Sequence, residues 1–259
     1  VPLVYTRRIA SPLRNNPRSR RKYGRAGLDA VIAISETVRK VFLESGYPAD
    51  RIFLAPSGLD VKALDDVPPD LALRNRFDSP PLVGGIGKLS RKKNWEFLLH
   101  AAARLKSEGR DIRWIIVGDG PRHTALTKLA AQLGVSDSVT FTGFVSQAER
   151  LLKTFDIFFF PSLREGAGIA VRQAMVCGVP IVAARCPGTE ESLNGHGRLI
   201  EPDDLDGAAR AVAALLDDRQ AAADLARTAR ADAIRRFDIA QTVEATLNAY
   251  RQVLDRGGA

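Results

Sequence analysis

Cysteine and long apolar runs are scarce in this chain of 259 residues. The two cysteines, Cys177 and Cys186, are too few for a disulfide framework and lack the spacing of a metal site, so a reducing compartment fits the composition. The longest apolar runs, such as residues 157–160, are far shorter than the roughly 20 residues that cross a bilayer. The composition therefore predicts neither a disulfide-rich fold nor a membrane-spanning segment.

Acidic residues are absent before Asp29. The same stretch contains no recognisable export signal, because arginines stand where a signal peptide has its apolar core. The basic residues of this stretch are Arg7, Arg8, Arg14, Arg18, Arg20, Arg21, Lys22 and Arg25. With the formal net charge of +8, they predict attraction to anionic partners, which could be nucleoside diphosphates, lipid headgroups or nucleic acid. The alternative is a solvated loop without an anionic partner. No nucleic-acid recognition module accompanies the charge. We expect a cytoplasmic protein, with peripheral binding to the inner membrane face as a hypothesis.

From residue 82 onward, apolar runs alternate with amphipathic stretches, a pattern typical of repeated strand and helix units. The expected strands are residues 82–86, 113–117, 138–141, 157–160, 180–183 and 198–200. This order predicts an α/β fold with a Rossmann-like, doubly wound parallel sheet. After residue 201 the chain has helical periodicity through Val253, with interruptions near Asp217 and Phe237.

The helix expected after the first of these strands begins near Asn94, which is a suitable capping residue. Its apolar positions follow helical spacing and form one stripe, for which we expect a place in the core: Trp95, Leu98, Leu99 and Ala102.

The first sixty residues differ from the rest, with expected strands at residues 3–5, 30–34 and 52–55 and a helix at 36–45. Residues 60–81 contain two proline pairs and are interpreted as a linker that leads into the next domain.

The most informative motif is PSLREGAGIAVRQAMVCGVPIVAA, residues 161–184. A strand is expected to end at Phe160, and three small residues, Gly166, Ala167 and Gly168, then lead into a helix. Small residues let backbone N–H groups approach a ligand closely, and a helix N-terminus favours negative charge. The motif predicts a phosphate site. The alternative is a tight packing turn, which is common in this class of sheet.

This motif resembles the donor-site signature of family 4 retaining glycosyltransferases of the GT-B fold, and the resemblance extends over essentially the whole chain. SETVRKVFLESGYPADRIFLAPSGLD is similar to the segment that closes the family's N-terminal domain. VGGIGKLSRKKNWEFLLHAAARL and IIVGDGPRHTALTKLAAQLGVSDSVTFTGFV resemble the first motifs of its donor domain. CPGTEESL and LIEPDDLDGAARAVAALLDD are similar to its last two blocks. The resemblance implies a donor-binding Rossmann-like domain and part of a second one.

At matching positions, the resemblance implies three candidate catalytic residues. Glu165 would contact hydroxyls of the donor sugar, for which an ionised acceptor is well suited. Lys88 and Lys93 would hold the donor diphosphate and offset charge on the leaving group. The alternative for Lys93 is a solvated basic run shared with Arg91 and Lys92.

The resemblance also implies a wider donor site. Besides Lys88, Lys93 and Glu165, it comprises Gly87, Gly143, Phe144, Gly166, Ala167, Gly168, Ile169, Gln173 and Glu191. Gln173 replaces a family glutamate that binds ribose hydroxyls, and Lys88 stands where arginine is commoner. Phe144 could equally be a core residue, and Glu191 an exposed residue at a helix start. No metal is expected, because Lys88, Lys93 and the helix start near Gly168 would stabilise the diphosphate and the histidines lack metal-ligand spacing. No cofactor is expected either, since the nucleotide sugar is the substrate.

The domains expected on this basis are residues 1–60 as a remnant of the acceptor-side domain, residues 61–235 as the donor-binding domain, and residues 236–259 as a helix that packs back toward the N-terminal part. The chain starts at Val1, and its one methionine is Met175. We expect about 100 or more residues of the N-terminal domain to be missing. The fragment is then expected to bind donor but to transfer sugar poorly.

The expected function is a bacterial-type, metal-independent, retaining transfer of a sugar from a UDP- or GDP-linked donor. The acceptor would be a saccharide or a lipid-linked molecule, in cell-envelope polysaccharide or lipopolysaccharide synthesis. One alternative is a non-catalytic nucleotide-sugar-binding module, which Gln173 favours. Another is a GT-B-fold sugar-nucleotide epimerase, which the few histidines disfavour. A dehydrogenase is disfavoured because the first strand-helix unit lacks Gly-x-Gly-x-x-Gly.

Overall fold

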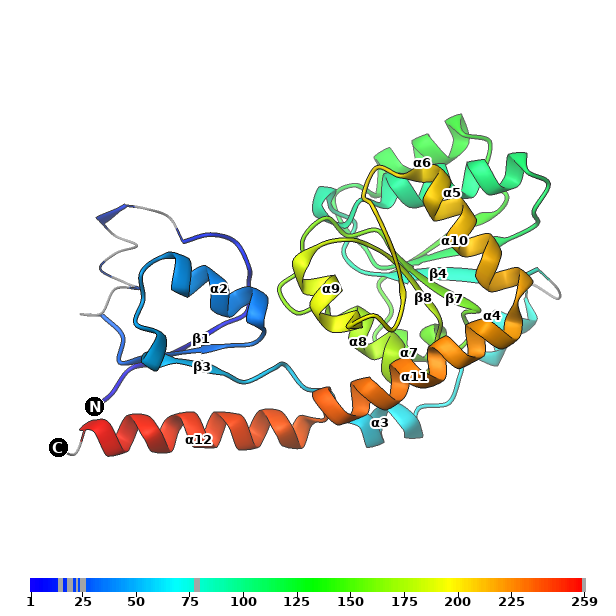
Figure 1. The fold of residues 1–259 in the computed structure, drawn as a ribbon. Coiled ribbons are helices and arrows are strands. Elements are labelled where there is room, and N and C mark those ends of the chain that lie inside the picture. Colours follow the sequence, from blue (N-terminus) through cyan, green and yellow to red (C-terminus); the bar gives the residue numbers. More distant parts are fainter. Residues whose placement is uncertain (14–15, 18–20, 22, 24–26, 77–79, 258–259) are drawn as a thin grey trace.

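The computed structural model describes residues 1–13, 16–17, 21, 23, 27–76 and 80–257. Two parallel sheets organise these residues into two lobes (Figure 1). The small sheet contains β1 (Val4–Arg7), β2 (Ala30–Ala33) and β3 (Ile52–Leu54). The large sheet contains β4 (Leu82–Ile86), β5 (Arg113–Val117), β6 (Val139–Gly143), β7 (Ile157–Phe160), β8 (Ile181–Ala184) and β9 (Arg198–Ile200).

The helices before the fifth strand are α2 (Glu36–Glu44), α3 (Val61–Asp66), α4 (Leu71–Asn75) and α5 (Trp95–Ser107). Short 3-10 helices occur at η1 (Ala49–Arg51) and η2 (Arg91–Lys93). The later helices are α6 (His123–Gln132), α7 (Ala148–Leu152), α8 (Ile169–Val176), α9 (Pro187–Leu193), α10 (Leu205–Asp217), α11 (Arg219–Phe237) and α12 (Ile239–Gly257).

The large sheet has the strand order β6-β5-β4-β7-β8-β9, with all strands parallel. The chain builds outward from β4 to β6 and then returns to add β7 beside β4 on the other side. This is the order of a doubly wound sheet, so the predicted α/β, Rossmann-like fold class is confirmed. In such sheets ligands bind beyond the carboxyl ends of the strands at the point of reversal, here β4 and β7.

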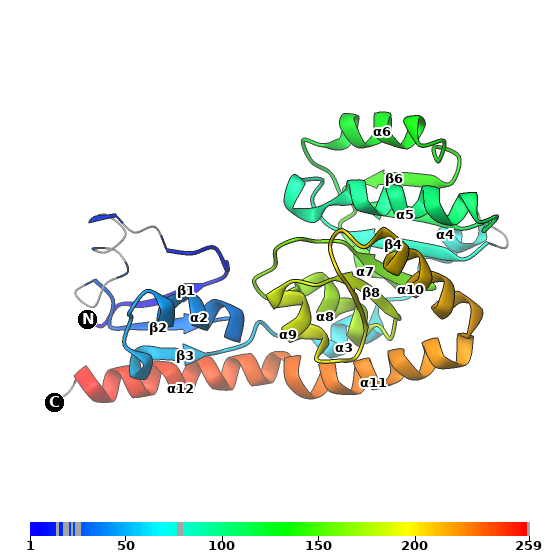
Figure 2. The same ribbon diagram turned by 45° about the horizontal axis from the view of Figure 1, so that its top comes forward.

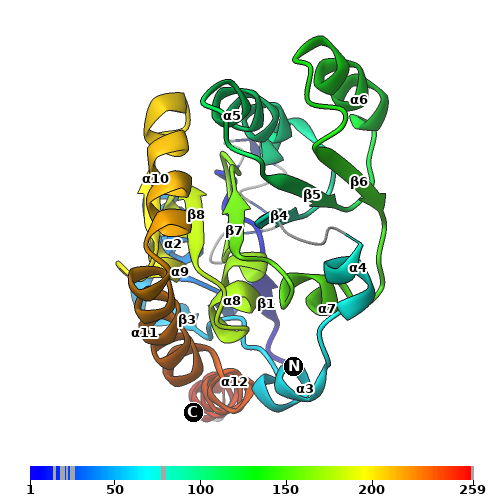
Figure 3. The same ribbon diagram turned by 90° about the vertical axis from the view of Figure 1, so that its right-hand side faces the viewer.

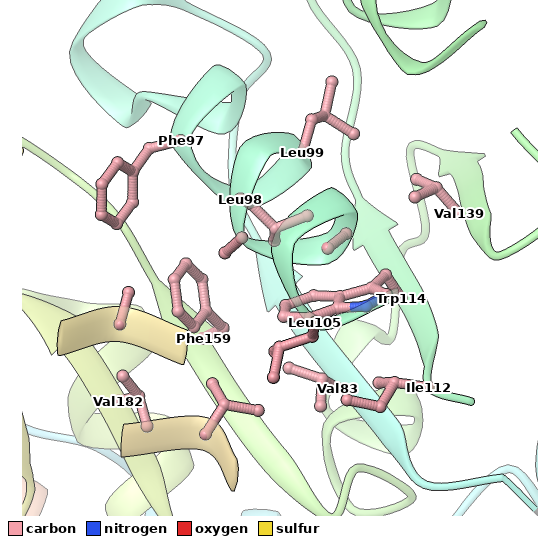
Figure 4. Close-up of a cluster of buried hydrophobic side chains, with 14 of the residues drawn as sticks. Val83, Phe97, Leu98, Leu99, Leu105, Ile112, Trp114, Val139, Phe159 and Val182 are labelled. Carbon is pink, nitrogen blue, oxygen red and sulfur yellow. The ribbon is translucent and has the colours of Figure 1, made fainter. Parts of the chain in front are cut away.

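Helices cover both faces of the large sheet, with α5 above and α8 below the strands in Figure 3. On the α5 side, Leu105 and Trp114 pack with Phe159 and Val182 (Figure 4). The predicted apolar stripe of α5 lies in this cluster and is at most 1% exposed. The strands therefore carry apolar side chains on both faces, as expected of a parallel sheet covered by helices.

The small sheet has the order β1-β2-β3 and is also parallel. Val38 and Phe42 of α2 pack on one face, and Ala249 of α12 packs on the other against Ile32 and Ala55. Figure 2 shows α12 running along the underside of this sheet. The small lobe is therefore built from the two ends of the described chain.

The chain crosses between the lobes twice, at residues 56–60 and 237–239, and the crossings lie side by side. The Leu59 N–H donates to Phe237 O at 2.7 Å, and the Ile239 N–H donates to Leu59 O at 2.9 Å. Gly58 belongs to the first crossing, where a Cβ would lie 2.8 Å from Ile239 Cα. We call this pair of crossing segments the hinge.

Two local predictions need correction. The start of α5 agrees with the prediction, because the helix begins at Trp95 directly after Asn94. The predicted side-chain cap is wrong, since Asn94 has φ of 54° and its side chain makes no capping hydrogen bond. Residues 60–81 are not a plain linker, because α3 and α4 form there and the Asp60 carboxylate caps α3 by accepting from the Ala63 N–H.

Much of the basic N-terminal segment, namely Arg14, Arg18, Arg20, Lys22 and Arg25, lies outside the described residues. In the part of the chain that is described, no helix is long and apolar enough to cross a membrane.

Candidate functional site

A cavity of about 410 Å³ lies between the lobes, beyond the carboxyl end of β7. The large lobe contributes residues 164–170, Lys92 and Lys93, and the small lobe contributes residues 8–11 and Ile34. Another cavity, of about 500 Å³, lies beside Pro81 and Pro180 at the amino ends of the strands and is lined by none of the predicted site residues. The cavity between the lobes is the candidate site because it lies at the reversal point of the sheet.

The glycine motif is held tightly at this cavity. Gly168 has φ of 57° and begins α8, and Ser192 Oγ of α9 donates to Ala167 O at 2.7 Å. A Cβ at Gly166 would lie 3.0 Å from Arg8 O in the small lobe. The small residues therefore let the loop pack closely against both α9 and the small lobe, besides leaving the α8 N-terminus open to an anion.

Lys93 and Glu165, two of the predicted catalytic residues, form an ion pair. Lys93 Nζ lies 2.7 Å from Glu165 Oε1, and each side chain is 14% exposed. Ser162 Oγ donates to the same oxygen at 2.6 Å, and the Lys93 ammonium lies 4.6 Å from the centre of the Phe160 ring. Within the described residues no donor reaches Oε2, which leaves that oxygen to accept a ligand hydroxyl.

Lys88 lies apart from this pair. Its side chain is exposed and does not line the cavity, while its carbonyl accepts from Trp95 Nε1 at 3.1 Å. Gly87 is closer to the pair, since a Cβ there would lie 3.3 Å from Lys93 Cε. The structure therefore brings Gly87, Lys93 and Glu165 together and leaves Lys88 exposed on the β4 loop.

The loops after β4, β5 and β6 are joined by backbone hydrogen bonds. The Gly87 N–H donates to Val117 O, and the Gly118 N–H donates to Gly143 O, each at 2.9 Å. Phe144 follows Gly143 and is 80% exposed, so it is not a core residue. An exposed aromatic ring at this edge can stack on a nucleobase.

Ile169 and Gln173 are four residues apart on α8 and therefore share a face of the helix. Ile169 is 38% exposed, and Gln173 is partly buried. The Gln173 amide offers one carbonyl acceptor and two N–H donors to a ligand.

Glu191 lies on α9 and faces the small lobe. Its carboxylate accepts from the Glu36 N–H, the Thr37 N–H and Thr37 Oγ1, each at 2.8 Å, and so caps α2 from outside. Beside it, Ser35 Oγ donates to Gly166 O at 2.5 Å. Both Glu191 oxygens are engaged, and its predicted contact with the donor stays a prediction.

Arg172 was not singled out from the sequence, although an arginine inside the apolar run IAVRQAMV is an available signal. Its fully buried guanidinium donates to Ser57 O at 2.8 Å and to Ser192 Oγ at 3.1 Å, and it lies 3.9 Å from the Phe237 ring centre. Burial lowers the pKa of Arg172 to about 10. The side chain ties α8 to both crossings of the hinge.

Acidic, histidine and cysteine side chains do not gather into a metal site in the described ranges, where no group of three or more could hold an ion. The charged groups at the cavity are the Lys93–Glu165 pair and further cations.

Known proteins are similar to this chain in sequence and fold. Residues 72–232 match the model of the family described as glycosyl transferases group 1. Over 240 residues the chain is 27% identical to 2-deoxystreptamine glucosyltransferase of Streptomyces kanamyceticus, covering 89% of this chain and 62% of that protein. It is 31% identical over 218 residues to GDP-mannose-dependent alpha-(1-6)-phosphatidylinositol monomannoside mannosyltransferase of Mycobacterium tuberculosis, covering 79% of this chain and 57% of that protein.

The crystal structure of Anabaena Alr3699/HepE in complex with UDP and glucose has a similar fold, with a TM-score of 0.85 and 24% sequence identity. The match covers 97% of this chain and 72% of that chain, and it shows a GT-B glycosyltransferase fold. The chain spans about three fifths of the length of the two curated relatives. On the extent of the family match, the chain belongs to the glycosyl transferases group 1 family.

Proposed function

We propose that this chain is the donor-binding part of a metal-independent, retaining glycosyltransferase of family 4. It takes a sugar from a nucleoside diphosphate and transfers it to a saccharide or lipid-linked acceptor. The observation that carries the proposal is the Lys93–Glu165 pair, which lies where the β4 and β7 loops meet the start of α8. A carboxylate and an ammonium at this edge of a doubly wound sheet suit a sugar hydroxyl and a diphosphate.

In this proposal the diphosphate lies between Lys93 and the N-terminus of α8, with Lys88 reaching it from the exposed β4 loop. The positive charges and the helix dipole stabilise the negative charge that develops on the departing nucleoside diphosphate. These groups supply the stabilisation for which other transferases use a metal ion. Glu165 accepts hydrogen bonds from the donor sugar, and the Gln173 carbonyl accepts one from the ribose.

The nucleotide base of the donor and the biological role are inferred from related proteins. UDP is bound in the Anabaena structure, and the mycobacterial relative is described as GDP-mannose-dependent, so we propose a UDP- or GDP-linked sugar as donor. The name of that relative also gives a lipid acceptor, in line with a role in cell-envelope synthesis.

Calorimetric titration with UDP, GDP, ADP, CMP and NAD tests the donor site. We expect one nucleoside diphosphate to bind. The Lys88→Ala/Lys93→Ala variant should bind it at least about tenfold more weakly, which corresponds to about 1.4 kcal/mol. Glu165→Ala should weaken binding of the sugar nucleotide more than that of the free nucleotide. Arg91→Ala, which removes an exposed cation of η2 outside the cavity lining, is the control. Failure of every nucleoside diphosphate to bind would contradict the proposal.

A non-catalytic nucleotide-sugar-binding module is a second candidate, favoured by Gln173 in place of a glutamate. Release of nucleoside diphosphate from a sugar nucleotide distinguishes the two. Tight binding without release or transfer, in a protein that also contains the complete small lobe, would support the module.

A further inference from the structure

The cavity between the lobes carries more positive charge than its one carboxylate can balance. Arg8, Lys92 and Arg164 line it together with Lys93, and Glu165 is the acidic residue among the lining side chains. Because Lys93 pairs with Glu165, the charges of the other three remain in excess. Like charges that line one cavity repel one another, so the arrangement favours an anion between them.

The three side chains are free to bind such an anion. Each is exposed, and no carboxylate among the described residues lies within ion-pair distance of any of them. Lys92 and Arg164 stand on segments that are joined, because the Leu163 N–H donates to Lys92 O at 2.8 Å, and Ser162 Oγ lies 3.2 Å from the same carbonyl. The large lobe therefore presents two cations from one fixed pair of loops.

The third cation comes from the small lobe on a loop that is itself held in place. Arg7, 3% exposed, donates through Nε to Ile9 O at 2.9 Å, and its guanidinium also bonds Ser11 O. The guanidinium lies 5.8 Å from the Tyr23 ring centre and 5.6 Å from that of Phe42. A buried cation satisfied by loop carbonyls fixes residues 8–11 as a wall of the cavity.

The position of Arg8, Lys92 and Arg164 differs from the position proposed for the donor diphosphate. On the proposed function, on which this inference rests, the diphosphate belongs to Lys88, Lys93 and the start of α8, all in the large lobe. Arg8 reaches the cavity from the small lobe, so the space that it lines together with Lys92 and Arg164 is left for the second substrate of the proposed transfer, the acceptor. We propose that the acceptor carries a phosphate group, which Arg8, Lys92 and Arg164 bind beside the sugar held by Glu165.

Phosphate is the anion that this set suits best. Two arginines offer planar guanidinium forks that match phosphate oxygens, and a lysine adds a point charge. A neutral acceptor would leave the three charges uncompensated, and an amine-bearing acceptor would be repelled. The phosphate could belong to a soluble phosphorylated sugar or polyol, or to a phospholipid headgroup.

The test is calorimetry on the chain saturated with UDP, with glycerol 3-phosphate as the probe and glycerol as its neutral counterpart. We expect glycerol 3-phosphate to bind and glycerol to bind at least about tenfold more weakly. The Arg8→Gln/Arg164→Gln variant should lose at least about tenfold in affinity for the phosphate and keep its affinity for UDP within about twofold. Arg91→Gln is the matched control and should leave both affinities unchanged.

Flotation with phosphatidylcholine vesicles, with and without phosphatidylglycerol, distinguishes a phospholipid acceptor from a soluble phosphorylated acceptor. Binding to the anionic vesicles that the double variant loses indicates a lipid headgroup, and binding of the soluble probe alone indicates a soluble acceptor. Equal binding of glycerol and glycerol 3-phosphate would overturn the inference. So would an equal loss of UDP affinity in the double variant, because the arginines would then serve the donor. If UDP itself does not bind, the proposed function fails, and the same titration without nucleotide decides whether a phosphate site exists.

Discussion

Lys93 and Glu165 hold each other in place at the site where the donor is proposed to bind. Their pair is mostly enclosed, and Ser162 and the Phe160 ring complete its surroundings. Side chains fixed by packing and hydrogen bonds present their charges to a ligand without first having to be ordered. The same contacts make each residue part of the stability of the lobe.

Lys93→Met separates these two roles. It keeps an unbranched apolar side chain beside Gly87 and leaves the Glu165 carboxylate with the Ser162 hydroxyl as its bonded partner. We expect the free energy of unfolding to fall by about 1–3 kcal/mol, since a largely buried carboxylate loses its counter-charge. Lys92→Met, at an exposed neighbouring position, should change it by less than about 0.5 kcal/mol. Equal effects of the two substitutions in urea unfolding would show that the pair adds nothing to stability.

Asp232 of α11 is expected to make the stability of the fold depend on pH in the acidic range. Its carboxylate is 3% exposed; burial raises its pKa, but hydrogen bonds from Arg236 and Arg235 outweigh burial, so the pKa of Asp232 lies below its ordinary value of 3.8. A carboxyl group with a lowered folded-state pKa stabilises the fold above its unfolded pKa. That stabilisation is lost as pH falls through the folded pKa.

Asp232→Asn should therefore destabilise the protein by about 1–3 kcal/mol at pH 7. The difference from the unmodified chain should shrink as pH falls below about 4. Unfolding in urea at several pH values measures this difference. Asp203→Asn, at an exposed position, controls for the removal of one charge. A difference that grows on acidification would contradict the assignment.

At the scale of elements, apolar runs bounded by turns gave reliable strands, and residues 82–86 and 157–160 match β4 and β7 in both bounds. The break at Phe237 also agrees, because α11 ends there and α12 begins at Ile239. The strand expected at 138–141 runs over Val139–Gly143 instead, since its end is set by the bond between Gly118 and Gly143. Such contacts with neighbouring strands leave no local signal in the sequence.

That Glu165 and Lys93 lie near each other could be expected from the sequence, but the way in which they contact each other could not. The glycine motif and its resemblance to a family placed Glu165 and Lys93 at one sheet edge, while their direct pairing depends on two loops 72 residues apart. The cap that Glu191 supplies to α2 joins residues 154 and 155 positions apart. Ser35 and Thr37 are ordinary at a helix start, so the pattern around them gives no sign of a contact with the other lobe.

The helix α12 is expected to hold the small sheet together, because Ala249 is fully buried against Ile32 and Ala55. Ala249→Asp places a carboxylate in this apolar contact, and we expect it to destabilise the small lobe by about 3 kcal/mol or more. Asn248→Asp adds the same group one position away on the exposed side and should be nearly neutral. Hydrogen exchange in β2 and β3 should rise in the first variant alone. Equal exchange in both variants would show that α12 is not needed there.

On the scale of the whole molecule, the lobes touch across the cavity as well as at the hinge. Glu191 caps α2, and Ser35 Oγ donates to the carbonyl of Gly166 in the glycine loop that precedes α8. Both lobes therefore form the wall of the cavity, and these hydrogen bonds fix the position of one lobe relative to the other.

Glu191→Ala removes the cap and should lower the free energy of unfolding by about 1–2 kcal/mol, as the loss of a helix cap does. It should also let the lobes separate, which small-angle scattering detects as a larger radius of gyration. Glu190→Ala is the control, because that exposed side chain pairs with Arg185 within the large lobe. An unchanged radius in the Glu191 variant would show that the hinge alone sets the distance between the lobes.

The paired crossings of the hinge restrict how the lobes can move. Two covalent links, joined to each other by backbone hydrogen bonds, resist twisting and sliding more than a single link does. Rotation about the one axis that passes through both links disturbs them least. Arg172 contacts both links from α8, so we expect α8 to stay with the axis if the small lobe rotates. Such a rotation would follow one angle and would move the Arg8 loop toward or away from the proposed donor site.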